Sequence, residues 1–160
     1  MKKLFLLLVA VLTLTVATRA QDLKNYQNKA FSIDYPASWE VTWDGDSFVN
    51  IATDDDAIRF SCSFNEMGPT KAQLKQAVDN WVYMKQNGGA TVDQKLVKDD
   101  YALVRSILTD DEDGTKTVEI WYLMISTEPQ GFSGSIQCPL ERANEAQDVL
   151  VAMLATLSPK

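Results

Sequence analysis

The sequence predicts an α+β fold in which an antiparallel β-sheet packs between helices. Two stretches of alternating apolar and polar residues, 31–66 and 91–138, are each followed by a segment with helical apolar spacing. Alternation with period two is typical of strands, and short turns between successive strands make them antiparallel. The apolar run at residues 120–125 indicates a strand buried on both faces, so the sheet needs a covering layer on each side.

The first stretch predicts four strands separated by turn sequences. Asp44-Gly45-Asp46 is a strong hairpin signal, and residues 54–56 form a second acidic turn. Cys62 alternates with the apolar set of the fourth strand, so we expect it to point into the core. The predicted strands are residues 31–35, 39–43, 48–52 and 58–64.

Two helices are expected. In the first, residues 70–87, Thr70 stands three residues before Gln73, as in a capping box, and Gly88-Gly89 is a stop signal. In the second, residues 142–157, apolar residues recur at helical spacing up to Leu157. Between them we expect strands over residues 91–98, 101–109, 117–126 and 132–138.

The first 20 residues predict a secretory signal peptide. Lys2 and Lys3 precede an apolar run at residues 4–17, and Ala20 provides a small residue for cleavage. The run is roughly 14 residues, short of the roughly 20 that span a bilayer. We therefore expect cleavage near Ala20, no membrane anchor afterwards, and a periplasmic or secreted single domain over residues 21–160.

Composition limits the chemistry of this domain. Residues 21–160 carry 12 basic and 22 acidic side chains, a formal charge of −10, which disfavours nucleic acid and anionic lipid. The chain has no histidine, so the commonest general base and zinc ligand are missing. We predict no catalytic residue, no cofactor and no metal site.

Cys62 and Cys138 are the only two cysteines. In an oxidising compartment an even pair favours one disulfide, with two buried free thiols as the alternative. A bridge would close a loop of about 77 residues and contribute roughly 4 kcal/mol. We expect a Cys62–Cys138 disulfide.

Other candidate sites have ordinary structural explanations. The acidic turn at residues 110–114 resembles a calcium loop, but Thr109 and Ile120 occupy ligand positions that need acidic groups. Two carboxylate pairs for glycoside hydrolysis, Glu119 with Glu128 and Asp34 with Glu40, have no supporting spacing. Tryptophans could form a sugar platform, although core packing explains their periodic positions, and we expect Trp43 to be the most exposed.

The segment Phe31-Ser-Ile-Asp-Tyr-Pro-Ala-Ser-Trp39 resembles the opening of PsbP-like domains, with Tyr35-Pro36-x-x-Trp39 as its most distinctive part. The first helix, the hairpin at residues 110–114 and the last helix follow the family's order. The resemblance covers nearly all of residues 21–160 and implies an antiparallel sheet flanked by helices, a PsbP-like α/β/α sandwich. It implies an accessory or binding role, and no site residue carries over.

These observations favour an exported, monomeric, non-enzymatic protein that binds another protein in the cell envelope. The negative charge favours a basic partner, and an immunity-type protein that blocks a basic toxin is one specific form. A small-ligand carrier with a pocket between sheet and helix is the alternative, and it requires a cavity of about 300 Å³ or more. A carboxylate-based hydrolase is the third hypothesis.

Overall fold

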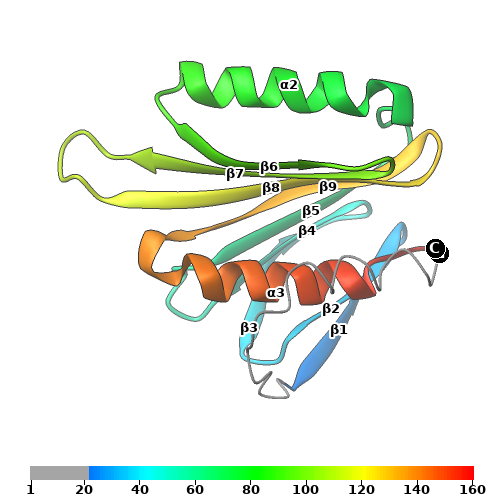
Figure 1. Ribbon diagram of the computed structural model, residues 1–160. Helices are drawn as coiled ribbons and strands as arrows, with labels where there is room; N and C mark the ends of the chain where they lie inside the picture. The colour runs from blue at the N-terminus through cyan, green and yellow to red at the C-terminus, as the bar shows by residue number, and fades with distance from the viewer. Residues whose placement is uncertain (1–21) are drawn as a thin grey trace.

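The computed structural model describes residues 22–160. The predicted signal peptide, residues 1–20, lies outside the described residues. Two antiparallel sheets and two α-helices make up the domain, which confirms the predicted α+β class (Figure 1). Among residues 22–160, no helix has the length and apolar character that crossing a membrane requires.

The large sheet has seven strands in the spatial order β3-β4-β5-β9-β8-β7-β6. Every neighbouring pair is antiparallel, as the short turns predict for all pairs except β5–β9, whose strands are distant in the sequence. The strands are β3 (Trp39–Asp44), β4 (Phe48–Thr53), β5 (Arg59–Asn65), β6 (Thr91–Val97), β7 (Tyr101–Thr109), β8 (Lys116–Thr127) and β9 (Gln130–Pro139).

Helix α2 (Lys71–Asn87) covers one face of the sheet at its β6 end (Figure 1). Leu74, Val78 and Trp81 pack on Ala102, Val104 and Leu123 to form the smaller of two cores. The backbone N–H of Thr70 donates to Gln73 Oε1 at 3.1 Å, which agrees with the predicted cap. The helix ends before Gly89, whose φ of +85° suits a glycine.

Helix α3 (Ala143–Thr156) covers the opposite face together with a small three-stranded sheet. It follows a short 3₁₀ turn, η1 (Leu140–Arg142). The small sheet has the order β1-β2-β10 and consists of β1 (Leu23–Gln27), β2 (Phe31–Pro36) and β10 (Ser158–Pro159). Thr156 Oγ1 accepts a 2.8 Å hydrogen bond from the Asp34 N–H, which ties the end of α3 to β2.

Both faces of β8 are buried, as the apolar run predicts. Ile120 and Tyr122 belong to the larger core beneath α3, whereas Leu123 belongs to the smaller core beneath α2. Two strands were not predicted. β1 has one buried residue, Tyr26, and β10 contains two residues, so neither shows an alternating apolar pattern.

The two cysteines do not meet. Cys62 on β5 lies opposite Gly134 of β9, and Cys138 lies four residues further along β9. Four strand residues span roughly 13 Å, well beyond the roughly 7 Å that a disulfide allows between Cα atoms. Both are free thiols, so the expected Cys62–Cys138 disulfide is not formed, and the alternative of two buried thiols describes the structure.

The thiol state gives the first testable prediction. Burial raises the pKa of Cys62 to about 12 and that of Cys138 to about 11, so little thiolate forms near pH 8. We expect the folded protein not to react with Ellman's reagent. In the denatured, unreduced protein we expect two thiols per chain to react. Denatured protein without titratable thiols would contradict this arrangement.

A second prediction concerns Gly134, where β5, β8 and β9 approach closely. A Cβ at this position would overlap the carbonyl oxygen of Ser61, which also accepts a 2.9 Å hydrogen bond from Tyr122 Oη. We expect Gly134→Ala to lower the free energy of unfolding by roughly 1–3 kcal/mol in chemical denaturation.

Gly88→Ala is the matched control because its Cβ would meet nothing closer than 3.4 Å. A neutral Gly134→Ala, or an equal loss in Gly88→Ala, would show that the close approach does not limit stability.

Candidate functional site

The four strands β3, β4, β5 and β9 leave one face of the large sheet uncovered. Helix α2 packs on β6 and β7 and reaches β8 through Trp81, whose ring stacks on Trp121 at 5.1 Å. Beyond Trp121 the same face is polar. Asn50, Ser61 and Ser135 lie opposite one another on β4, β5 and β9. We call this surface the open half-face.

The open half-face contains a cavity of about 450 Å³. Most of its lining is polar and neutral, and its charged members form an ion pair with each other. Hydroxyl and carboxamide groups can both donate and accept hydrogen bonds. The lining residues are Thr42, Asn50, Ile51, Asp56, Arg59, Phe60, Ser61, Ser135 and Gln137.

A β-bulge places Trp43 on the open half-face. Val41 lies opposite Ile51, but Trp43 lies opposite Asn50, so the register shifts between them. Strict alternation would put Trp43 on the buried side with Trp39, as the sequence pattern suggested. The bulge turns it outward, where 64% of its surface is exposed. This confirms the expectation that Trp43 is exposed.

Phe48 supports Trp43 on this face, with ring centroids 4.5 Å apart. Their position depends on the Asp44-Gly45-Asp46 turn, because a Cβ on Gly45 would overlap the Phe48 ring. The Gly45 N–H donates to the Phe48 carbonyl at 3.0 Å and closes the hairpin. The turn that the sequence predicted therefore also positions an aromatic pair.

The charged groups in and beside the cavity, Asp56, Arg59 and Glu119, are already paired, while the exposed Glu40 of β3 lies outside its lining. Arg59 donates from Nε to Asp56 Oδ1 at 2.8 Å and from its terminal nitrogen to Oδ2. Asp56 has a φ of +55°, in the left-handed region that aspartate tolerates better than most residues. Gln137 Nε2 donates to Glu119 Oε1 at 3.1 Å, and Glu119 also pairs with Lys85 of α2.

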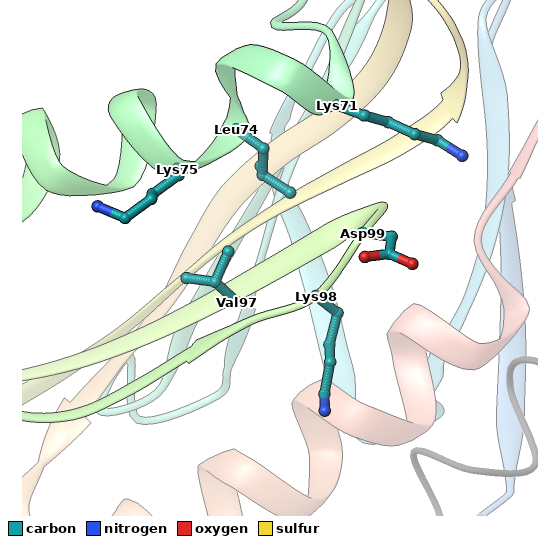
Figure 2. Close-up of a pocket in the computed structure, with 6 residues that line it drawn as sticks. All are labelled: Lys71, Leu74, Lys75, Val97, Lys98 and Asp99. Atoms are coloured by element: carbon teal, nitrogen blue, oxygen red, sulfur yellow. The ribbon is translucent and has the colours of Figure 1, made fainter.

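A second cavity, of about 510 Å³, lies between α2 and the β6–β7 hairpin (Figure 2). Leu74 and Val97 form its apolar part. The lysines at its rim extend in different directions rather than toward one point (Figure 2). The residues that line it are Lys71, Leu74, Lys75, Val97, Lys98 and Asp99.

The outward face of α2 has an unusual composition. From residue 76 onward its most exposed residues are uncharged, and they include Tyr83 (66% exposed) and Met84 (63%), whereas its two charged side chains, Asp79 and Lys85, are partly exposed. The charged residues of this part of α2 form ion pairs. The Asp79 carboxylate accepts hydrogen bonds from Lys75 and Lys95, which lowers the pKa of Asp79 to about 2. Lys85 lies 5.2 Å from the Trp81 ring centroid and pairs with Glu119.

The structure separates the carboxylates of each hydrolase hypothesis. Glu119 pairs with Lys85 near the end of α2, while Glu128 accepts a 2.6 Å hydrogen bond from the Lys71 N–H at its start. These two helix positions are roughly 20 Å apart, beyond the roughly 5–9.5 Å of glycosidase pairs. Asp34 and Glu40 lie on different sheets.

The acidic turn at residues 110–114 is a hairpin turn that bonds to itself. Asp110 Oδ1 accepts from the Glu112 N–H and Asp113 Oδ1 from the Thr115 N–H, each at 2.7 Å. Gly114 has a φ of +73°, as such a turn requires. Within residues 22–160, no group of three or more acidic or cysteine side chains gathers as a metal site.

Sequence reasoning missed the open half-face as a site. Its signal is the alternation of serines 61, 63, 133 and 135 with buried apolar residues, which marks a sheet face without a covering layer. The outward turn of Trp43 has no such signal, because the bulge depends on the pairing of β3 with β4.

Comparison with solved structures identifies the fold. The Ran-binding protein Mog1p of Saccharomyces cerevisiae superposes with a TM-score of 0.61 at 13% identity, covering 87% of this chain and 96% of that chain. The cyanobacterial PsbP (CyanoP) of Synechocystis gives 0.57 at 9% identity, covering 94% and 99%. The chain therefore has a PsbP-like fold, which agrees with the resemblance of its opening segment.

A protein from Bacteroides thetaiotaomicron superposes with a TM-score of 0.50 at 20% identity and covers 84% of this chain. This chain spans about half of that protein's length, 49%. No family model matches the sequence, and no curated protein matches it. At these identities the likenesses show the fold alone.

Proposed function

We propose that this chain is an exported, non-enzymatic accessory protein that binds a protein partner through the outward face of α2. The observation that carries the proposal is the scarcity of free charge on α2 after Lys75: the two charged residues there, Asp79 and Lys85, are both held in ion pairs, within a chain in which 23% of residues are charged. Interface centres are depleted in charged residues and enriched in tyrosine and methionine. Tyr83 and Met84 fit that composition.

The fold is consistent with such a role, because Mog1p, which has the same fold over nearly its whole length, is a Ran-binding protein. The charge of −10 favours a basic partner, since an acidic field accelerates the approach of a cationic protein. The toxin of an immunity-type pair is one partner of this kind. The exposed acidic turns at residues 54–56 and 110–113 are its most concentrated sources of negative charge.

A small-ligand carrier is the second candidate, and the cavity beside α2 favours it. Its volume of about 510 Å³ exceeds the roughly 300 Å³ expected of a ligand pocket. The pocket lies between helix and sheet, as that hypothesis requires. Its rim lysines diverge and Lys75 already bonds Asp79, so they form no converging anion site (Figure 2). The α2 face therefore supports the stronger proposal.

Export gives the third prediction. We expect the protein recovered from envelope or medium to begin at about Gln21, measured as the intact mass of the purified chain. Leu8→Arg interrupts the apolar run and should leave the full-length chain inside the cell. A wild-type chain that keeps residues 1–20 and stays in the cytoplasm would contradict export.

The partner surface gives the fourth prediction. We expect a photo-crosslinking amino acid at position 83 to give one discrete adduct in cells, and the same group at position 23 to give none. Leu23 is a matched control because it is 55% exposed and lies on β1, in the small sheet.

Unlabelled protein should compete for the adduct, and Met84→Glu competitor should be at least about tenfold weaker because it places a charge in the interface. A basic partner should also give less adduct as salt rises. Equal adducts at positions 83 and 23, or full competition by Met84→Glu, would contradict the α2 interface.

A further inference from the structure

We infer that the open half-face is a binding site for a neutral saccharide chain. The site comprises the cavity of about 450 Å³ and the aromatic pair Trp43–Phe48 beside it. This inference is independent of the α2 interface and of the proposed protein partner. It assigns a ligand class to a surface that the rest of the fold leaves uncovered.

Trp43 points outward from the sheet. Exposing most of an indole forfeits the burial that a regular strand would give it next to Trp39. A β-bulge produces this exposure, and bulges often re-aim side chains beside functional sites. Phe48 holds one side of the indole at 4.5 Å, while 64% of the Trp43 surface faces solvent. A preformed, exposed aromatic surface suits the apolar face of a sugar ring.

Groups that can form hydrogen bonds lie beside this aromatic pair. Asn50, Ser135 and Gln137 present groups that both donate and accept, as sugar hydroxyls do. The Ser61 hydroxyl is occupied, because it accepts from the Ser135 N–H at 3.1 Å. Within residues 22–160, the Asn50 carboxamide and the Ser135 hydroxyl make no side-chain hydrogen bond, so both can contact a ligand.

The charged groups in and beside the cavity are paired with one another. Arg59 and Asp56 form a bidentate ion pair. Glu119 accepts a hydrogen bond from Gln137 and forms an ion pair with Lys85. The lining of the cavity therefore carries no net charge, although the described residues as a whole are strongly acidic. Anionic ligands meet the repulsive field of the molecule, and a cation finds no unpaired carboxylate in the lining. A neutral polyhydroxylated ligand satisfies both conditions.

The polar residues form a row across the strands. Asn50, Ser61, Ser135 and Trp121 lie on four adjacent strands, so the row spans roughly 14 Å at about 4.8 Å per strand. Trp43 lies beyond Asn50 at one end, and the Trp121–Trp81 stack stands at the other. A row of polar groups between two aromatic positions fits several sugar units in line across the strands rather than one.

Nuclear magnetic resonance titration with cellohexaose, maltohexaose and chitohexaose tests the inference on isotope-labelled mature protein. We expect at least one of these probes to shift the backbone amides of Asn50, Ser61 and Ser135 saturably. Trp43→Ala should weaken that binding at least about tenfold, whereas Trp43→Phe should keep it within about threefold because a stacking ring remains.

Leu23→Ala is the matched control. Leu23 is 55% exposed and lies on β1 in the small sheet, outside both proposed surfaces, so its truncation should leave saccharide affinity unchanged. Unchanged amide shifts far from position 43 confirm that each variant is folded.

Three results would overturn the inference: no shift with any probe at about 10 mM, equal binding by Trp43→Ala, or shifts spread over the whole surface. If the captured partner protein protects these amides and no saccharide does, the open half-face belongs to that protein instead. Loss of saccharide binding alone leaves the α2 adduct intact, so the two proposals fail separately.

Discussion

The close approach of β5, β8 and β9 is the constraint on which the rest of the structure depends. Tyr122 Oη reaches across Gly134 to the Ser61 carbonyl at 2.9 Å, and the Tyr122 ring lies parallel to Phe60. Burial raises the pKa of Tyr122 far above its ordinary value, so the phenol stays a hydrogen-bond donor. Only a glycine leaves room for this crossing. On the other face, the Ser61 hydroxyl bonds the Ser135 backbone, so one residue fixes both the core and the open half-face.

The two helices cover opposite faces of the large sheet at opposite ends. Helix α2 covers one face at the β6 end, and α3 with the small sheet covers the opposite face toward the β3 end (Figure 1). At the uncovered end, serines stand at positions where a covering helix would require apolar residues. Exposure there costs little because hydroxyl groups remain solvated. An open, polar sheet surface is thus a consequence of the fold rather than an addition to it.

Local patterns in the sequence predict much of this fold. The strands, both helices and the acidic hairpin are encoded by alternation, helical spacing and turn residues, and these signals need no tertiary information. The disulfide prediction failed because burial of Cys62 and Cys138 says nothing of their separation, which the register of β5 on β9 sets. Trp43 was predicted to be exposed, but its face was not predicted, because the bulge depends on the partner strand. Strands β1 and β10 have too few buried residues to produce a pattern.

Charge placement separates the two proposed surfaces while keeping them adjacent. Lys75 and Lys95 both donate to the Asp79 carboxylate on the β6 side of α2, and Lys85 pairs with Glu119 on β8. These pairs engage both charged residues of the second half of α2, Asp79 and Lys85, and the Glu119 carboxylate beside the open half-face. The boundary between the surfaces is the Trp81–Trp121 stack, where Lys85 covers one indole. Because Glu119 also accepts from Gln137, a ligand that takes the Gln137 carboxamide acts on the same ion pair that orients Lys85 on α2. Glu119 is therefore the residue at which the two surfaces meet, through its contacts with Lys85 of α2 and Gln137 of β9.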